Sequence, residues 1–319
     1  MSAPNDEFLY RGEAASFAGG LLQRILPWMR ILPAGFAWWL GGRLGHGYAH
    51  TGGRDNRRCR EHLARAFPTW DRRAVERCAR RCFRHFGRMA LWSLSTLHRD
   101  PRQLRRGMAL EGADHLRAAG RACRAGRGLV CCSGHLGNWE VLARVMGTML
   151  PVTVLGKRQR DAGIDRLIQR VRTEHGNRQI YQHEGLGPCV RTVRAGRVLA
   201  TLPDQDVPRL QGCFVPWFGH PAYTPIGPAA VAQLTGAPLQ LVFCFAVGRR
   251  WVIHWSPQRR FTGPDRSANM LAATAWAMRY QEQLVRRHPE QWAWWHKRWR
   301  TRPEQRPQAP GAAAHLPGS

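Results

Sequence analysis

Short apolar runs alternate with longer polar stretches from residue 128 onward. Four of these runs span four to nine residues each, which is too short for most helices and typical of buried strands: 129–132, 152–155, 198–202 and 239–247. Residues 251–255 follow the last run across Gly248, so we predict that these two segments pair as a hairpin.

The stretches between and before these runs carry apolar residues at helical spacing. In one of them, Val75, Cys78, Cys82 and Phe86 fall on a single face and are predicted to point into the core. Strands that alternate with helices predict the α/β class, here a mixed sheet flanked by helices. We expect helices over residues 57–68, 72–85, 139–150, 165–175, 225–235 and 267–288.

Composition divides the chain into four parts. Residues 1–13 are polar, and residues 303–319 are rich in proline, glutamine, alanine and glycine, so we predict that both are disordered. Residues 14–106 are predicted to form a helical, membrane-associated N-terminal region, and residues 107–302 the α/β core.

The apolar N-terminal segment is interrupted by Arg24, Arg30 and Arg43. No uncharged run in it reaches the roughly 18 residues that a membrane-spanning helix needs. Residues 31–42 carry two tryptophans, which favours a helix lying in the membrane interface. A first helix of the protein core is the alternative.

Basic residues far outnumber acidic ones. The formal net charge is +28, the pI is about 11.5, and all but two of the 49 basic side chains are arginines. A genomic preference for arginine codons explains part of this excess. The rest indicates an anionic partner, namely a membrane surface, an acidic protein or a nucleic acid. We expect no nucleic acid, because the chain lacks zinc-ligand spacing, an RNA-recognition signature and a basic heptad helix.

The nine cysteines include no Cys-x2-Cys pair and are odd in number. This pattern predicts reduced thiols rather than a disulfide framework. Cys131 and Cys132 lie in an apolar run and are expected to be buried. We expect no metal site and no cofactor.

The most informative segment is Gly-Leu-Val-Cys-Cys-Ser-Gly-His-Leu-Gly-Asn-Trp-Glu, residues 128–140, in which a strand ends and a helix begins. His135 follows the strand and Asn138 is the predicted helix cap, which is where α/β folds place their chemistry. A histidine there can remove a proton from a hydroxyl, and Glu140 can hold its other ring nitrogen. Alternatively, Asn138 and Glu140 only cap and charge the helix start.

We therefore predict His135 and Glu140 as the catalytic pair. The backbone amides of Gly137 and Asn138 are predicted to stabilise a developing oxyanion. The segment 204–206, Asp-Gln-Asp, follows another predicted strand and should lie on the same rim of the sheet, unless it is only a polar turn.

Four blocks of the chain resemble, in order, those of the lipid A late acyltransferases of Gram-negative bacteria. The first is similar to the family's Gly-His-Phe-Gly-Asn-Trp-Glu block with its His-x4-Asp/Glu motif. Together the blocks place the resemblance over roughly residues 20–303. The four blocks are residues 134–140, 202–206, 212–228 and 288–299.

This resemblance implies a glycerolipid-acyltransferase-like fold and an enzyme at the cytoplasmic face of the inner membrane. The donor it implies is acyl-acyl carrier protein, and the acceptor is a hydroxyl of a lipid A precursor. The basic surface would then attract the acidic carrier protein and anionic lipids. A lysophospholipid, an ornithine lipid or another glycolipid is the alternative acceptor. A nucleic-acid-binding module or a purely structural membrane protein is a more distant alternative.

The resemblance also implies substrate-binding residues. Arg158 and Arg172 are expected to bind phosphates or acidic sugars of the acceptor, unless they belong to a solvated basic face. Asp204 and Gln205 are expected to have a structural or substrate-positioning role close to the site rather than to transfer a proton.

Two further features fall in the third block. Thr224 and Gly227 resemble an acceptor-phosphate motif at a helix start, where backbone amides can bind an anion. An aromatic stretch is predicted either to line a channel for the acyl chain or to pack on the core. It comprises Phe214, Trp217, Phe218 and Tyr223.

Overall fold

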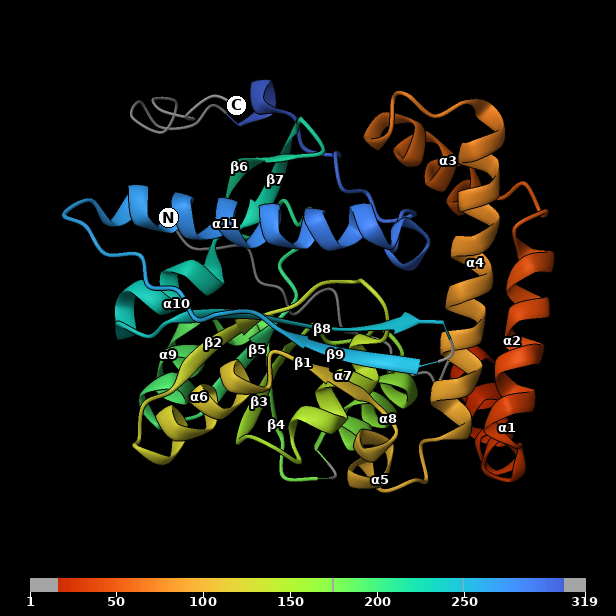
Figure 1. Cartoon of the computed structure of the whole chain (residues 1–319), viewed down its shortest axis with the longest axis horizontal. Coiled ribbons are helices and arrows are strands. Elements are labelled where there is room, and N and C mark those ends of the chain that lie inside the picture. The colour runs from red at the N-terminus through yellow and green to blue at the C-terminus, as the bar shows by residue number, and fades with distance from the viewer. Residues whose placement is uncertain (1–16, 174, 249, 307–319) are drawn as a thin grey trace.

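A mixed sheet runs through the centre of the molecule (Figure 1). The computed structural model describes residues 17–173, 175–248 and 250–306, and within them seven strands pair in the order β1-β9-β8-β2-β5-β3-β4. All neighbours are parallel except β8 and β9, which form the predicted antiparallel hairpin. The strands are β1 (Ala109–Glu111), β2 (Leu129–Cys132), β3 (Val152–Gly156), β4 (Arg178–Tyr181), β5 (Val198–Thr201), β8 (Leu239–Val247) and β9 (Arg250–Trp255).

Two hydrophobic layers sandwich this sheet because successive strand residues point to opposite faces. Val130 and Cys132 join one layer, whereas Leu129 and Cys131 join the other. The first layer includes α9 (Leu186–Arg194), α10 (Gly227–Thr235) and α11 (Arg266–Arg287), together with the separate hairpin of β6 (Gly212–Trp217) and β7 (His220–Pro225). The second includes α6 (Ala113–Arg124) and α7 (Trp139–Met146).

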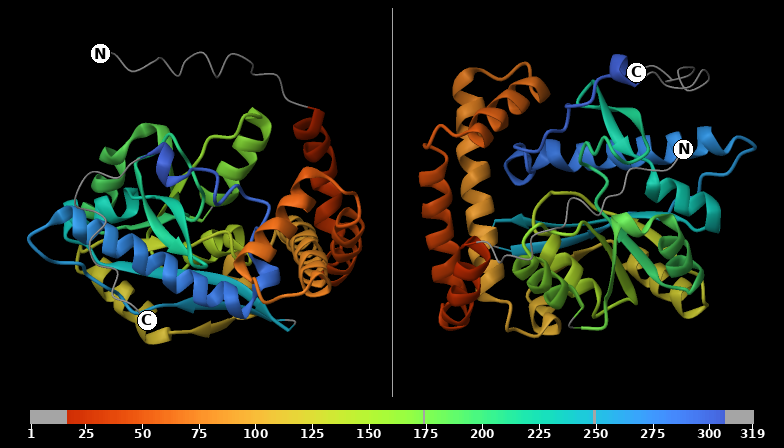
Figure 2. Two further views of the ribbon diagram at one scale, coloured as in Figure 1. Left: turned by 90° about the horizontal axis from the view of Figure 1, so that it is seen from above. Right: turned by 180° about the vertical axis from the view of Figure 1, so that it is seen from behind.

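The remaining helices flank the sheet. They are α1 (Phe17–Ile31), α2 (Ala34–Tyr48), α3 (Arg54–Ala66), α4 (Arg72–Ser95), α5 (Pro101–Arg106) and α8 (Ala162–Thr173). Helices α1 to α4 stand together at one side of the sheet, as both views of Figure 2 show. Helix α2 lies against α4 at backbone contact distance, since a Cβ atom on Gly45 would come within 2.1 Å of the Phe83 carbonyl oxygen. Gly41 meets Gly87 in the same way.

The strongly apolar elements agree with the sequence prediction. The four predicted strands and the hairpin partner are confirmed to within about one residue, and Asp71 caps α4 by accepting a hydrogen bond from the Ala74 amide. Helix α4 extends to Ser95, well beyond the predicted end at residue 85. The sequence prediction missed the short edge strands β1 and β4, the helices α6 and α9, and the β6–β7 hairpin.

The N-terminal and C-terminal predictions are tested only in part. The predicted disorder of residues 1–13 lies outside the described residues. Pro303–Gln305 forms a turn of 3-10 helix, so the predicted disordered tail does not begin at residue 303. Within the described residues, none of the helices has both the length and the apolar character needed to span a bilayer.

Candidate active site

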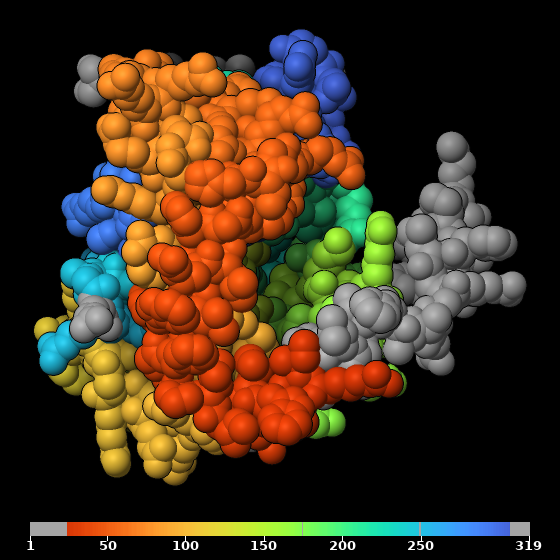
Figure 3. All heavy atoms as spheres, turned by 90° about the vertical axis from the view of Figure 1, so that its right-hand side faces the viewer, coloured from red at the N-terminus to blue at the C-terminus, as the bar shows by residue number. Residues whose placement is uncertain are grey.

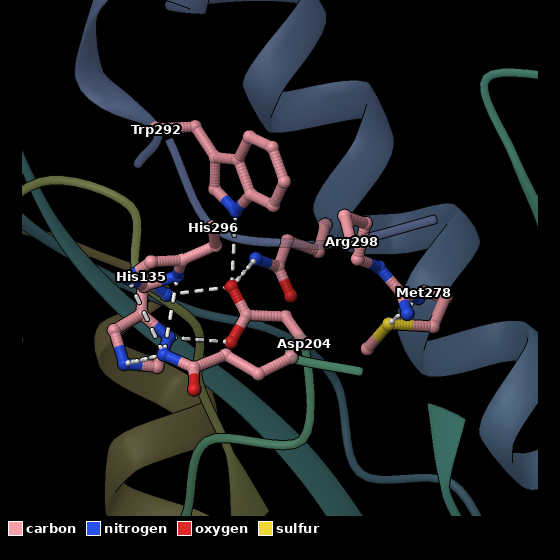
Figure 4. Close-up of polar contacts among 8 residues, drawn as sticks. His135, Asp204, Met278, Trp292, His296 and Arg298 are labelled. Carbon is pink, nitrogen blue, oxygen red and sulfur yellow. Dashed lines mark hydrogen bonds and ion pairs between the residues drawn. The ribbon is translucent and has the colours of Figure 1, made fainter. Parts of the chain in front are cut away.

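The candidate site lies at the carboxyl ends of β2 and β5. These strands are parallel neighbours, so the segments that follow them leave the sheet at the same edge. Hydrogen bonding continues one residue past the strands, from the Ser133 amide to the Thr201 carbonyl oxygen at 2.8 Å. His135 and Asp204 come directly afterwards, and Figure 4 shows their side chains in contact. The prediction that segment 204–206 shares the rim with His135 is confirmed.

Asp204 holds His135 by two hydrogen bonds. The His135 ring nitrogen Nδ1 lies 2.7 Å from Asp204 Oδ1, and the His135 backbone amide donates to Oδ2 at the same distance. Two further groups donate to Oδ2, namely the Gln281 amide at 2.8 Å and the Trp292 indole at 3.0 Å. The carboxylate is fully buried, and every contact fixes its orientation.

The charge of Asp204 is retained despite this burial. Burial alone raises the pKa of a carboxyl group, but the adjacent His135 ring and the hydrogen bonds from His135 and Trp292 outweigh it and hold the pKa of Asp204 well below its usual range. An ionised carboxylate accepts the Nδ1–H of His135 and leaves the lone pair on Nε2. The arrangement therefore presents Nε2 as a general base, and it stabilises the imidazolium that forms.

Two neutral groups surround that nitrogen. The side-chain amide nitrogen of Gln205 lies 3.0 Å from His135 Nε2 and 3.1 Å from Nδ1 of His296. The rings of His135 and His296 are 4.6 Å apart. Burial, reinforced by the neighbouring His135, lowers the pKa of His296 to about 3, so His296 is neutral at physiological pH.

Glu140 occupies a different place from the one predicted. Its carboxylate forms a two-pronged ion pair with Arg172 of α8, with distances of 2.6 and 3.0 Å, and Asp204 takes the contact with His135 Nδ1 that we expected of Glu140. Burial lowers the pKa of Arg172, but the charge of Glu140 outweighs it and raises that pKa. Glu140, five positions after His135, therefore links α7 to α8.

The predicted oxyanion donors are also engaged elsewhere. The Gly137 amide donates to the Gln291 carbonyl oxygen at 2.8 Å, and the Asn138 amide donates to the Cys244 carbonyl oxygen at 2.7 Å. Gly137 has a φ of +64°, and a Cβ atom there would come within 2.0 Å of the Cys244 oxygen. Asn138 caps α7 as predicted, through the Val141 amide. The prediction that these two amides stabilise an oxyanion is wrong because both are already used.

The predicted substrate-binding residues do not form one surface. Asp204 is buried, Thr224 is buried and accepts a hydrogen bond from Arg298, and Arg172 is bound to Glu140. None of these three can meet an acceptor in the way we expected. Arg158 is exposed in the loop after β3, and Gly227 is half-buried in the first turn of α10.

The aromatic stretch belongs to the core rather than to a channel. Trp217, Phe218 and Tyr223 are buried, and the Trp217 and Trp292 rings lie 5.4 Å apart. Arg298 is buried beneath the same region, where it donates to the Tyr223 carbonyl oxygen and lies beside Met278 (Figure 4). Of the two interpretations of this stretch, core packing is the correct one.

The comparison with known proteins settles the family. The sequence profile of the family described as bacterial lipid A biosynthesis acyltransferase matches residues 6–301. The chain belongs to this family. It is 30% identical over 206 residues to a phosphatidylinositol mannoside acyltransferase of Mycobacterium tuberculosis (strain ATCC 25618 / H37Rv), which covers 62% of this chain and 61% of that protein.

Two Escherichia coli relatives fall in the same range. The chain is 25% identical over 248 residues to the lipid A biosynthesis palmitoleoyltransferase of strain K12, covering 76% of this chain and 78% of that protein. It is 25% identical over 216 residues to the lauroyltransferase of the same strain, covering 64% and 65%. The chain thus spans about three fifths of the length of the mycobacterial relative and about three quarters of the palmitoleoyltransferase.

A groove with apolar and basic walls lies among the helices that flank the sheet. It encloses about 490 Å³ between α1, α4 and α8, and Figure 3 shows the hollow on this side, between the N-terminal helices and the green segments. Two of its walls are held to α7 and its cap: Asn138 donates to Ser93 of α4, and Arg172 of α8 pairs with Glu140. It is lined by Leu26, Pro27, Arg30, Leu94, Leu97, His98, Gly163, Arg166, Leu167, Arg170 and Val171.

Several residues of this acyltransferase-family site escaped the sequence analysis. Gln281 and His296 were not predicted, although His296 lies in the fourth block that resembles the family. Trp292 lies in the same block and was not predicted either; it is fully buried and donates to Asp204. Among the described residues, no cluster of three or more histidine, cysteine or acidic side chains is arranged to hold a metal ion.

Proposed function

We propose that this protein transfers a fatty acyl group from acyl-acyl carrier protein to a hydroxyl of a lipid A precursor or a related glycolipid. One observation carries the proposal: a histidine at the edge of the sheet has its Nδ1 held by a buried, ionised carboxylate while its Nε2 faces polar neighbours. That geometry suits removal of a proton from a hydroxyl. Membership of an acyltransferase family agrees with it.

In the proposed reaction His135 Nε2 takes the proton of the acceptor hydroxyl while the oxygen attacks the thioester carbonyl. Asp204 orients the ring and stabilises its positive charge. When the tetrahedral intermediate collapses, the C–S bond breaks and the proton passes from His135 to the sulfur. A thioester is already activated, so the residues in place need form no covalent acyl-enzyme.

The groove between α1, α4 and α8 is the proposed site of the acyl chain. Its walls are mostly leucine, proline and valine, and its volume falls within the range of small-molecule pockets. Arg30, Arg166 and Arg170 line the same groove. Guanidinium groups there suit the phosphate of a donor's prosthetic arm or of the acceptor.

A lipid A precursor is the first candidate acceptor because the family and the Escherichia coli relatives carry that name. The mycobacterial relative, whose name refers to a phosphatidylinositol mannoside, supports another glycolipid as the second candidate. A lysophospholipid or an ornithine lipid has the same reacting group. A panel of these purified acceptors, with mass analysis of each product, separates them.

The proposed place of action is the cytoplasmic face of the inner membrane, by peripheral association. Large apolar side chains on α1 and α2 are exposed, and Arg24, Arg30 and Arg43 lie among them. Such a mixture suits the headgroup zone of an anionic bilayer. These apolar side chains are Ile25, Trp28, Ile31, Phe36, Trp39, Leu44 and Tyr48.

Replacing two of these side chains tests the membrane contact. We expect Trp28→Glu together with Trp39→Glu to weaken binding to phosphatidylglycerol vesicles at least about tenfold, since removing a large side chain from water contributes roughly 2 kcal/mol. Co-sedimentation measures this. Leu234→Glu, on α10, is the control because Leu234 is equally exposed on another helix. Equal losses in both proteins would contradict the proposed surface.

The decisive test of the reaction is His135→Ala. We expect acyl transfer from lauroyl-acyl carrier protein to fall at least about 10³-fold, because general-base catalysis is lost. Product mass measures transfer, and circular dichroism checks the fold. His183→Ala is the matched control, since His183 is exposed in the turn of 3-10 helix after β4. Full activity in the His135 variant would end the proposal.

A further inference from the structure

We infer that Gln205 and His296 are the oxyanion donors of this site and that Gln205 holds the place of the acceptor hydroxyl in the resting enzyme. The inference rests on the proposed acyl transfer and names residues that act in it. It begins from the contact of the Gln205 side-chain amide with both His135 Nε2 and His296 Nδ1.

In the resting enzyme the lone pair of His135 Nε2 is already occupied. With Nδ1–H donated to Asp204, His135 Nε2 carries one lone pair and accepts one hydrogen bond. The Gln205 amide, 3.0 Å away, supplies it. An acceptor hydroxyl needs the same lone pair, because its proton must be transferred to Nε2. The acceptor can therefore react only after the Gln205 amide leaves this nitrogen.

When it leaves His135, the Gln205 amide can turn toward His296. The amide nitrogen also lies 3.1 Å from His296 Nδ1 and 3.4 Å from His296 Nε2, so rotation of the Gln205 side chain moves a donor from one ring toward the other. His296 is neutral because burial lowers its pKa to about 3. A neutral imidazole carries a hydrogen on one of its two ring nitrogens. Gln205 and His296 thus offer two uncharged donors beside the base.

The proposed reaction needs such donors for the oxyanion that forms on the thioester carbonyl. The amides of Gly137 and Asn138 are bonded to the Gln291 and Cys244 carbonyl oxygens, so they are not free for the reaction. When the acceptor oxygen forms its bond to the thioester carbon, the carbonyl electron pair moves to the oxygen. Donors in place at that oxygen lower the barrier without rearrangement. Gln205 and His296 border His135 on the side where this oxygen must form.

Every proton and electron pair of the proposed reaction is accounted for. The hydroxyl proton moves to His135 Nε2, and the oxyanion accepts N–H groups from Gln205 and His296. The electron pair then returns to re-form the carbonyl, the C–S bond breaks with its pair going to sulfur, and His135 returns the proton to that sulfur. The products are an ester and the free thiol of the carrier, and Gln205 can rebind Nε2.

Four variants test the inference with lauroyl-acyl carrier protein and a purified lipid A precursor. We expect Gln205→Leu and His296→Leu each to lower kcat about 10²-fold, the cost of removing one oxyanion donor, without raising KM for the acceptor. His296→Gln keeps a neutral N–H and should recover activity to within about tenfold of the native protein. His135→Ala should be inactive.

Two readouts separate catalysis from support of the fold. A phosphonate mimic of the tetrahedral intermediate should bind the leucine variants more weakly by the same factor as kcat falls, whereas a non-hydrolysable amide analogue of the donor should bind them normally. The loss in His296→Leu should be equal across the pH profile, because neutral His296 does not titrate in that range.

The outcomes distinguish a failure of the oxyanion assignment from a failure of the proposed function. Native kcat in Gln205→Leu, unchanged binding of the phosphonate, or loss of the acidic limb of the pH profile in His296→Leu would overturn the inference. An active His135→Ala protein would instead overturn the proposed function. Inactive His135→Ala with a fully active Gln205→Leu leaves the proposed function standing and removes only the oxyanion assignment.

Discussion

The two sides of His135 are built differently. On the inner side, Asp204 is fully buried and receives hydrogen bonds from the His135 ring and backbone, from α11 and from Trp292. On the outer side, Glu140 is one-third exposed and pairs with Arg172. The inner carboxylate touches the base and the outer one does not. Glu140 was predicted to hold the His135 ring because the two residues are close in the chain. That prediction is wrong, because Glu140 lies in the first turn of α7 and its side chain pairs with Arg172 instead.

The two carboxylates also differ in how their charges are matched by neighbouring cations. Among the described residues, no arginine or lysine is bonded to Asp204, so its negative charge is available to stabilise the imidazolium of the proposed reaction. Glu140 already has its charge matched by Arg172, which leaves little of its field for His135. The inner side is expected to control proton transfer, and the outer side to control how α8, one wall of the groove, is held against α7.

The largest expected effect comes from breaking the inner side. Asp204→Asn keeps the shape but removes the charge and disturbs the tautomer of His135, so kcat should fall by about 10³ to 10⁴-fold, as in other acid-oriented histidines. Steady-state transfer assays measure this, and thermal denaturation checks the fold. A loss smaller than that of Glu140→Gln would reverse the comparison.

A smaller effect is expected on the outer side. Glu140→Gln removes a charge-assisted contact of about 2 kcal/mol, which corresponds to a loss of about tenfold to 100-fold in kcat/KM if the groove is displaced. Arg172→Met should do the same. The double variant should lose little more than either single one, because both delete one interaction. Additive losses in this double-mutant cycle would show that Glu140 acts on the reaction independently of Arg172.

The smallest effect concerns pH and stability. Burial lowers the pKa of His62 to about 4 and that of His296 to about 3, whereas both titrate near 6.5 when unfolded. Between those values the unfolded chain binds protons that the folded chain excludes, so stability is complete above pH 6.5 and declines as the pH falls. At pH 5.5 each histidine should cost about 1 kcal/mol. Denaturant unfolding at the two pH values measures the loss.

A substitution of His296 tests whether this residue causes part of the pH dependence of stability. His296→Gln cannot take up a proton, so its stability should fall less than that of the native protein between neutral pH and pH 5.5. His183→Gln, at an exposed position in the turn after β4, should leave the native dependence unchanged. An identical decline in all three proteins would mean that His296 titrates normally in the folded state.

The predictability of the fold follows burial. The runs that became β2, β5 and β8 are almost entirely apolar and lie inside the sheet, so the pattern identified them. Strands β1 and β4 lie at its edges, where half-exposed sequences such as Arg-Gln-Ile-Tyr have no distinctive alternation. The β6–β7 hairpin contains Pro216 and Pro221, which obscured its strand character.

The predictability of the site follows sequence distance. The position of His135 could be predicted because a strand, a turn and a helix cap meet within a few residues. The rim location of Asp204 was also predictable, from the end of another apolar strand. Its contact with His135 was not, because it depends on β2 and β5 being neighbours, which only the whole sheet decides. Gln281 and Trp292 lie on later elements that no local pattern connects to Asp204.

The hydrogen bonds that meet at Asp204 also make the site depend on segments far apart in the chain. Gln281 and Trp292, which both bind Oδ2, come from elements that follow the whole sheet in sequence. A chain cut before residue 292 would therefore keep every strand of the sheet and still leave Asp204 without its indole donor. We expect such a chain to hold the His135 ring less firmly and to lose the proposed activity.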